Sequence, residues 1–161
     1  MNLDDFKKEA KRAEGDTRKL LDKLKRKKPG DLDVQFEQFH EEAFEHIDCL
    51  KCGNCCRTTS PIFYDKDIER AAKAVRMKPG DFVQKYLQLD EDKDYVLKET
   101  PCAFIDADNY CLIYEDRPLA CREYPHTNRK RMFQVLDLAM KNSMICPAVL
   151  EITKKLKGIY K

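Results

Sequence analysis

The spacing of apolar positions predicts two helices at the start of the chain. Between residues 4 and 27, apolar side chains recur every three or four positions in a charged segment: Phe6, Ala10, Ala13, Leu20, Leu21 and Leu24. This period is typical of a helix with one buried face, which could loosen at Gly15-Asp16. Pro29-Gly30 ends this helix, and Asp31 is the expected cap of the next one. The apolar face of the second helix consists of Leu32, Phe36, Phe39, Ala43 and Ile47.

Shorter elements follow along the chain. Helices are predicted at about residues 65–75 and 81–87, with a helical turn at 118–124. Residues 95–98, 103–105 and 110–114 have the composition of short strands, and residues 106–109 supply turn chemistry. The segment from Arg131 fits a strand or a helix, and a last helix runs from Pro147 to about Lys157, with Cys146 next to its start. We therefore predict an α+β fold that is mainly α-helical, with an N-terminal helical hairpin and a small β-hairpin or meander.

Charge is unevenly distributed, although the net charge is only +2. Residues 1–29 contain eleven Lys or Arg and six Asp or Glu, whereas residues 31–48 contain seven acidic residues and no Lys or Arg. The two helices should therefore attract each other. The basic run at residues 25–28 resembles a nucleic-acid patch, but cations in a last helical turn also complement the helix dipole. The near-neutral net charge favours the second interpretation, so no nucleic-acid partner is expected.

Four cysteines lie within eight residues: Cys49, Cys52, Cys55 and Cys56. The stretch is polar and turn-like, so packing does not explain them. The N-terminus lacks the apolar run of a secretory signal, and no window is apolar enough to span a membrane. We therefore expect a cytoplasmic protein without a membrane partner. In a reducing compartment, clustered cysteines indicate metal binding or catalysis before they indicate disulfides.

The spacing of the cluster suggests which metals it could bind. A Cys-x2-Cys turn places two thiolates on one metal, and Cys49, Cys52 and Cys55 repeat that spacing, as a ferredoxin loop does for a [4Fe–4S] cluster. The pattern departs from a ferredoxin run because the next cysteine, Cys56, is directly adjacent. Neighbouring side chains usually diverge, so Cys55 and Cys56 should not bind one ion equally. One of them would face a second centre or remain a reactive thiol.

Four further thiols are spread along the chain at Cys102, Cys111, Cys121 and Cys146. They are too far apart for a local zinc knuckle, so any centre that they join is closed by the tertiary fold. Eight cysteines allow two four-thiolate sites, or one site with the other thiols in reserve. Each later thiol taken alone could also be a small buried apolar residue. Cys146-Pro147 resembles the Cys-Pro that ends a ferredoxin run.

The histidines are weaker candidates for this chemistry. His40 is expected to be solvated on the acidic helix. His46 lies three residues before Cys49 and could be a metal ligand or a hydrogen-bond donor to one. His126 could be a ligand or a proton donor, but a surface position explains it as well.

Three arginines lie beside cysteines in the sequence. Arg57 follows Cys56, and Arg117 and Arg122 stand on either side of Cys121. Cationic neighbours lower the pKa of a thiol and offset the negative charge of a thiolate-rich centre. Ion pairs with the acidic residues at positions 115 and 116 explain the last two arginines equally well.

Five blocks of sequence occur in a fixed order. They are Cys49-x2-Cys52-x2-Cys55-Cys56, Pro101-Cys102-Ala103-Phe104, Cys111-Leu112-Ile113-Tyr114-Glu115-Asp116-Arg117-Pro118, Cys121-Arg122-Glu123-Tyr124-Pro125 and Cys146-Pro147. Together they resemble the YkgJ-type cysteine-cluster family, the CxxCxxCC proteins. The resemblance implies a cytosolic zinc- or iron-chelating domain over about residues 49–150, and some relatives are labelled iron–sulfur oxidoreductases. The cysteine domain of flagellin lysine methylases is also similar, but this chain shows no methyl-donor site.

The sequence therefore predicts a charged helical extension at residues 1–48, packed on a cysteine-cluster metal-chelating domain at residues 49–161. All eight cysteines are candidate metal ligands, with Cys49, Cys52 and either Cys55 or Cys56 first among them. We favour an iron–sulfur cluster over zinc, in redox chemistry or electron transfer with a redox partner. The alternative is a structural zinc module that displays the basic N-terminal helix to a protein partner. No substrate site is recognisable, so an enzymatic role stays open.

Overall fold

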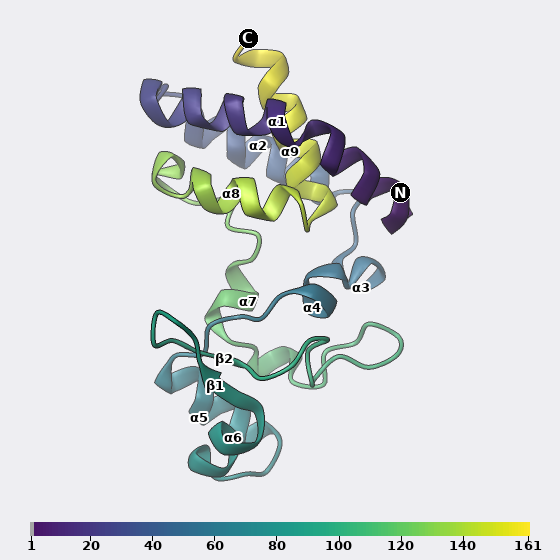
Figure 1. Cartoon of the computed structure of the whole chain (residues 1–161), viewed down its shortest axis with the longest axis vertical. Helices are drawn as coiled ribbons and strands as arrows, with labels where there is room; N and C mark the ends of the chain where they lie inside the picture. Colours follow the sequence, from purple (N-terminus) through teal and green to yellow (C-terminus); the bar gives the residue numbers. More distant parts are fainter. Residues whose placement is uncertain (1) are drawn as a thin grey trace. The chain divides into compact units, whose positions relative to one another are not determined.

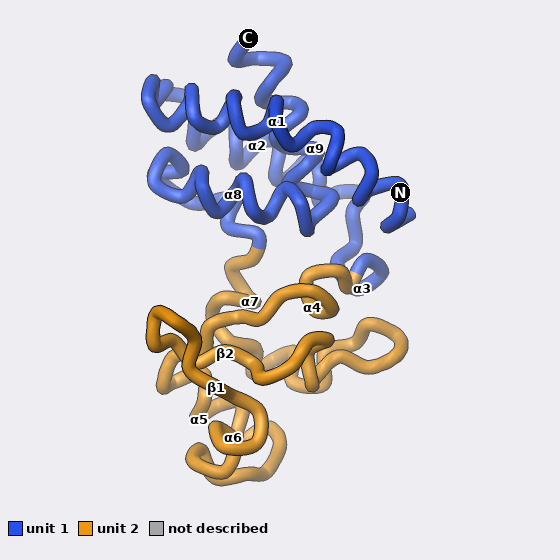
Figure 2. Tube along the Cα trace, in the orientation of Figure 1, with its two compact units in different colours: residues 1–52, 125–161 blue, residues 53–124 orange. Residues whose placement is uncertain are grey.

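The computed structural model describes residues 2–161, and its longest element is the N-terminal helix α1 (Leu3–Lys27). The chain divides into two compact units (Figure 2). The helical unit comprises the chain up to Cys52 together with Pro125–Lys161, and the cysteine-rich unit comprises Gly53–Tyr124. The expected domain boundary after residue 48 is not tested by this division and stays a prediction. None of the helices within residues 2–161 is long and apolar enough to cross a membrane.

The helical unit is built from four helices (Figure 1), which contribute large buried apolar side chains to its core. They are α1, α2 (Leu32–Phe44), α8 (Leu136–Ser143) and α9 (Pro147–Ile159). Helix α2 packs on α9, and α1 packs on α8 and α9. The largest fully buried side chains are Phe6, Leu24, Phe36, Leu136, Ile152 and Leu156, with Met132 of the 3-10 turn η2 (Met132–Gln134). The predicted N-terminal helices and the last helix are thus confirmed.

Both ends of α1 follow from its sequence. The side chain of Asn2 accepts a hydrogen bond from the N–H of Asp4 at 2.7 Å and caps the first turn. Basic residues occupy the last turn, and the chain leaves the helix at Lys28 in the left-handed conformation (φ 46°). The helix continues through Gly15, so the expected loosening there is wrong. One glycine disfavours a helix by only about 1 kcal/mol, which the burial of the apolar face outweighs.

Helix α2 begins after Asp31, but the expected capping role of this residue is wrong. Its side chain makes no cap hydrogen bond and instead accepts one from the hydroxyl of Tyr160, at the end of α9, at 2.8 Å. The helix ends at Phe44, so Ile47 falls in the following turn. The carboxylate of Asp31 is therefore bonded to the end of α9 and not to the first turn of α2.

Opposite charges join the first two helices to α9. Asp16 of α1 pairs with Lys157 at 2.5 Å, and Glu42 of α2 pairs with Lys155 at 2.8 Å. Glu42, one of the acidic residues at 31–48 that were expected to attract the basic N-terminal helix, thus pairs with a cation on the last helix. The first pair is largely exposed and the second is partly exposed, so each contributes little to stability.

The cysteine-rich unit is built around a cluster of aromatic rings. Phe82 is fully buried, and its ring stacks on that of Phe104 with the centroids 5.8 Å apart. The rings of Phe63 and Tyr86 also contact the ring of Phe82, with centroid distances of 6.0 and 5.1 Å. The helices and strands of this unit are α4 (Asn54–Thr58), α5 (Asp65–Ala74), α6 (Pro79–Tyr86), β1 (Leu87–Leu89), β2 (Tyr95–Leu97), the 3-10 turn η1 (Tyr114–Asp116) and α7 (Leu119–Glu123).

Strands β1 and β2 form a two-stranded antiparallel sheet with Leu87 opposite Leu97. This confirms a mainly helical fold with a small β element, but β1 was not predicted, and its first residue, Leu87, was expected to end a helix. Helix α6 stops at Tyr86 because the carbonyl of this residue accepts a hydrogen bond from the N–H of Lys98, across the hairpin, at 2.9 Å. Cross-strand pairing therefore replaces the next helical turn.

The strands expected at residues 103–105 and 110–114 are wrong. Within residues 2–161, this region contributes one isolated bridge, between Ile105 and Cys111. The predicted turn does form, because the carboxylate of Asp106 accepts a hydrogen bond from the N–H of Tyr110 at 2.9 Å. Directly after the bridge, the N–H of Tyr114 donates to the carbonyl of Cys111 at 3.2 Å and η1 begins. A longer strand has no room between the two turns.

Candidate metal centre

The eight cysteines fall into one group in each unit, and none of them forms a disulfide within residues 2–161. The thiols of the cysteine-rich unit are Cys55, Cys56, Cys102, Cys111 and Cys121. The helical-unit thiols are Cys49, Cys52 and Cys146. Cys49 is exposed, Cys146 is buried, and the other six are partly buried.

Backbone contacts hold three cysteines of the cysteine-rich unit together. The N–H of Cys102 donates to the carbonyl of Cys56 at 2.8 Å. Cys111 bridges to Ile105, which lies three residues after Cys102. Both Cys102 and Cys111 pack against the aromatic cluster. The N–H of Phe104 also donates to the sulfur of Cys102 at 3.5 Å, a contact that favours the thiolate form.

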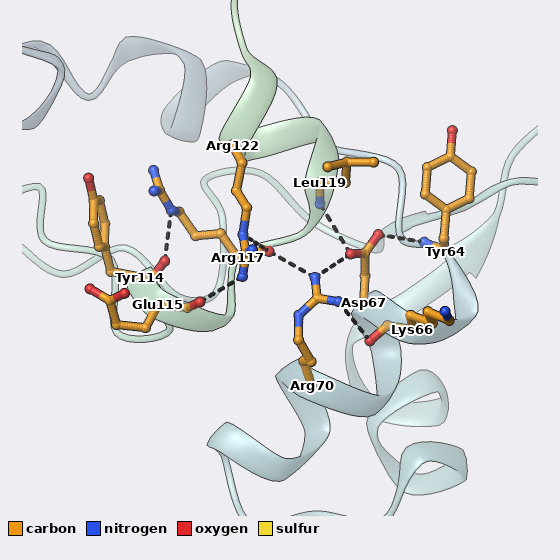
Figure 3. A network of polar contacts seen from close by, with 9 residues as sticks. All are labelled: Tyr64, Lys66, Asp67, Arg70, Tyr114, Glu115, Arg117, Leu119 and Arg122. Atoms are coloured by element: carbon orange, nitrogen blue, oxygen red, sulfur yellow. Dashed lines mark hydrogen bonds and ion pairs between the residues drawn. The ribbon is translucent and has the colours of Figure 1, made fainter.

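The fourth thiol is positioned through a buried carboxylate, that of Asp67 on α5 (Figure 3). It accepts hydrogen bonds from the N–H of Leu119, at the start of α7, at 3.1 Å and from the guanidinium of Arg70 at 2.5 Å. Arg70 donates in turn to the carbonyl of Arg117 at 3.2 Å. Helix α7, which carries Cys121, is therefore fixed to α5 at its first residue.

The two arginines beside Cys121 have different roles. The guanidinium of Arg117 lies over the ring of Tyr114, 3.7 Å from its centroid, and its charge also lowers the pKa of Cys56. Arg122 donates to the carbonyls of Arg117 and Glu115 at 3.1 and 2.7 Å. Of the two explanations from the sequence, a cation near a thiol therefore fits Arg117. Arg122 stabilises the turn between η1 and α7.

A close approach between Gly53 and the side chain of Asn109 fixes the start of the cysteine-rich unit. Gly53 has φ 56°, and a Cβ at this position would lie 2.7 Å from the side chain of Asn109. The carbonyl oxygen of that side chain accepts hydrogen bonds from Arg57, one of them from Nε at 3.1 Å. Glycine is thus required here by both conformation and space. From the sequence, Asp67 was one of two possible helix caps and Asn109 was part of a turn, but their contacts with Leu119 and Arg57 were not predicted.

The thiols of the cysteine-rich unit differ in how easily they lose a proton. A hydrogen bond from the Cys55 thiol, together with the charges of Arg117 and Arg57, lowers the pKa of Cys56 to about 7. Burial raises the pKa values of Cys102 and Cys111.

The Cys121 thiol has the most strongly raised pKa of this unit. Burial raises it to about 12, and the neighbouring thiols of Cys56, Cys102 and Cys111 act in the same direction. Cys102, Cys111 and Cys121 are therefore poor thiolates without a cation beside them, whereas Cys56 is favoured as a thiolate by Arg57 and Arg117.

The helical-unit thiols come from two segments. Cys49 and Cys52 lie one turn apart on the short helix α3 (Cys49–Cys52), so they share a face. Cys146 is the N-cap residue of α9. Burial raises the pKa of the Cys146 thiol to about 11, and the thiols of Cys49 and Cys52 are near enough to add to that effect.

The helical unit contains a cleft of about 580 Å³. It is lined by Cys52, by Pro147 next to Cys146, and by both members of a hydrogen-bonded pair, His46 and Glu151. The Nε2 of His46 lies 2.9 Å from a carboxylate oxygen of Glu151 on α9. The remaining lining residues are Leu3, Glu9, Ile47, Asp48, Lys51, Leu150 and Lys154.

The other two histidines do not line this cleft. The Nδ1 of His40 is 2.8 Å from the hydroxyl of Thr127, which is fully buried, and the imidazole contacts the ring of Phe44. Burial lowers the pKa of His40. His40 is thus a packed residue and not the solvated one expected. His126 has φ 63° in the loop before η2 and is partly buried.

Among residues 2–161, no three His, Cys, Asp or Glu side chains stand close enough to enclose a metal ion as they are. The side chains of either group would have to rotate to reach a common ion. The donors nevertheless suit a soft or borderline metal, because thiolates are the ligands that iron–sulfur clusters and zinc prefer.

Comparison with known protein families shows which family has this arrangement of cysteines. The family model described as "CxxCxxCC: Putative zinc- or iron-chelating domain" matches residues 48–147. The chain belongs to the CxxCxxCC family. All eight cysteines lie within the CxxCxxCC match, which supports metal binding in general and confirms the resemblance seen in the sequence. No curated protein and no solved structure matches the chain.

Proposed function

We propose that the cysteine-rich unit binds one metal centre through four thiolates, and that this centre is an iron–sulfur cluster used in electron transfer. The ligands would be Cys56, Cys102, Cys111 and Cys121. The observation that carries the proposal is the gathering of four thiols from four separate segments in one unit, through the backbone hydrogen bond between Cys102 and Cys56, the packing of Cys102 and Cys111 on one aromatic cluster and the attachment of α7 to Asp67. Burying thiols together in this way is unfavourable for their charged forms, and a bound metal supplies the compensating positive charge.

The number of thiols, and the hydrogen bonds and charges near their sulfurs, favour an iron–sulfur cluster whose reduction potential the protein sets. Four is the number of cysteines that bind [2Fe–2S] and [4Fe–4S] clusters, which supply one-electron transfer when bound. Hydrogen bonds to sulfur and nearby charge set the reduction potential of such clusters. Here the N–H of Phe104 donates to Cys102, and the cations of Arg57 and Arg117 act on Cys56. The thiols also require a reducing compartment, so we place the protein in the cytoplasm.

The same four thiolates would satisfy one tetrahedral zinc ion, which gives the alternative function of a structural module for a protein partner. One observation favours it. The segment from 99 to 118 carries two of the ligands, and η1 is the sole helix or strand that the structure places there within residues 2–161. A bound metal would therefore stabilise a region with little regular structure of its own, as structural zinc does.

Purification without oxygen, followed by analysis of iron, acid-labile sulfide and zinc with a visible absorption spectrum, distinguishes the two functions. Iron and sulfide with a broad absorbance that bleaches reversibly on reduction support the cluster. Colourless protein with stoichiometric zinc supports the structural module. Protein that binds neither metal contradicts both.

Matched variants test the ligand set. Cys102→Ser should abolish the iron and its absorbance, whereas Cys146→Ser, in the helical unit, should leave both unchanged. Loss of the iron in Cys146→Ser with retention in Cys102→Ser would show that the ligands are grouped differently. Cys55 is adjacent to Cys56 and stays a candidate ligand, which Cys55→Ser tests by the same measurement.

A further inference from the structure

The helical unit holds three thiols that the centre proposed above does not use. Cys49 and Cys52 lie on one face of α3, and Cys146 is at the start of α9. Cys52 and Pro147 line the same cleft, so the two segments face a common space. Three thiolates leave a tetrahedral ion one ligand short.

His46 lines this cleft as well, and its orientation is fixed by a carboxylate. A carboxylate accepts but does not donate hydrogen bonds, so the proton between the two side chains belongs to Nε2 of His46. In the neutral imidazole, the lone pair then lies on Nδ1. Metal-binding histidines typically donate their other ring N–H to a carboxylate in this way, which fixes the tautomer and makes the ligand more basic. Glu151 would be that partner.

The sequence places His46 suitably for the same role. It precedes Cys49 by three residues, and Cys49 precedes Cys52 by three. Glu151 lies one turn into α9, whose first residue follows Cys146. Both of the segments that supply thiols therefore also supply one member of the His46–Glu151 pair, at 2.9 Å.

We propose that the helical-unit thiols, together with Nδ1 of His46, bind a second metal ion of the zinc type, with Glu151 as the residue that orients the imidazole. Three thiolates and one imidazole are an established ligand set for structural zinc. All four ligands belong to the helical unit, so this centre is separate from the four-thiolate centre and does not depend on it.

Cobalt titration of the full-length chain, freed of metal and kept reduced without oxygen, tests the proposal. Cobalt(II) reports the number of bound ions and, through its visible bands, distinguishes four sulfur ligands from three sulfurs and one nitrogen. Two equivalents should bind to the wild-type protein. One should remain in Cys102→Ser/Cys111→Ser, with the spectrum of a mixed sulfur and nitrogen site.

Variants in that background test the histidine and its partner. His46→Asn should weaken binding of the remaining ion at least as much as Glu151→Gln, for which a ten- to hundredfold loss of affinity is expected. Glu42→Gln is the matched control for Glu151, because both carboxylates pair with Lys155 but only Glu151 contacts His46. His40→Asn is the control for the loss of an imidazole. Neither control should change the affinity or the spectrum.

Three results would overturn the assignment, and each has a different meaning. One equivalent in the wild-type protein, lost in Cys102→Ser/Cys111→Ser, rules out the second centre but leaves the proposed function intact. Unchanged affinity and an unchanged spectrum in His46→Asn would exclude the histidine as a ligand of the second ion. Binding of no cobalt at all would contradict both this centre and the four-thiolate centre. His46 is more than half exposed, so its replacement should not impair folding.

Discussion

The backbone N–H of Leu119 donates a hydrogen bond to the buried carboxylate of Asp67, 52 residues earlier in the chain, at 3.1 Å. The same carboxylate accepts from the N–H of Tyr64 at 3.0 Å and pairs with Arg70. One side chain thus caps α5 and fixes the first residue of α7. Its importance follows from burial, since an unpaired group left at this place would have no water to replace its partners.

We predict that Asp67→Asn lowers the free energy of unfolding of the metal-free protein by about 2 kcal/mol, because hydrogen bonds to a charged acceptor are lost. Urea unfolding followed by circular dichroism measures this change. The metal affinity of the cysteine-rich unit should fall as well, since α7 carries Cys121. Asp65→Asn is the control, because Asp65 lies in the same first turn but is exposed. Equal effects of the two substitutions would contradict the prediction.

Gly53 gives a second test of local geometry. Gly53→Ala introduces a side chain at φ 56° and within 2.7 Å of Asn109. The left-handed conformation alone disfavours an alanine by about 1 kcal/mol, and displacement of Asn109 also releases Arg57. We expect a loss of about 2 kcal/mol in unfolding free energy, measured by urea unfolding.

Two further variants test whether the left-handed conformation and the contact with Asn109 cause this loss. Gly15→Ala should instead stabilise the protein by up to about 1 kcal/mol, because this glycine is in the middle of α1 with no atom within 4 Å of a new Cβ. Asn109→Ala should remove the steric part of the loss when combined with Gly53→Ala. If Gly53→Ala destabilises equally with and without Asn109, the close approach is not the cause.

The long helices could be predicted because their determinants are local. The apolar period of α1 and the Pro29-Gly30 stop lie within the segment that they define, and both ends match to within a residue. The cluster of cysteines could likewise be recognised as chemistry from its spacing alone. For α6, by contrast, the apolar pattern continues through Leu87, and the helix stops at Tyr86 only because Lys98 pairs with that residue's carbonyl.

The grouping of the thiols could not be predicted for a similar reason. Cys56 and Cys102 are neighbours through one backbone hydrogen bond, and Cys121 is placed through Asp67. Both contacts join residues more than forty positions apart, and no periodicity or spacing reports them. The adjacency of Cys55 and Cys56 did indicate that the two thiols would differ, but not which later cysteines each would meet.

His40 predicts how the helical unit responds to acid. Burial lowers its pKa below the ordinary value of 6.5, so the folded state disfavours the charged imidazole. Its contribution to stability is therefore present above about pH 6.5 and is lost as the pH falls through the folded pKa, with a slope of at most about 1.4 kcal/mol per pH unit for one proton. The ring signals in an NMR titration should show a pKa below 6.5 for His40. His40→Asn should reduce the loss of unfolding free energy between pH 7 and pH 5, whereas an unchanged loss would exclude His40 as its source.

Metal binding by the cysteine-rich unit should release protons in a number that the thiol pKa values set. At pH 7 the thiols of Cys102, Cys111 and Cys121 are protonated, because burial raises their pKa values, while Cys56 with a pKa of about 7 is half ionised. Binding of zinc as four thiolates should therefore release about 3.5 protons at pH 7, and zinc affinity should rise steeply with pH.

Calorimetric titration of zinc in buffers of different ionisation enthalpy gives this number, measured in Cys49→Ser/Cys146→Ser so that only the four-thiolate centre binds. Arg117→Gln removes a cation that favours the Cys56 thiolate, so the release should rise towards four. Arg122→Gln, which loses contacts to backbone carbonyls alone, should leave it unchanged. A release of two protons or fewer would show that fewer than four of these thiols bind the ion.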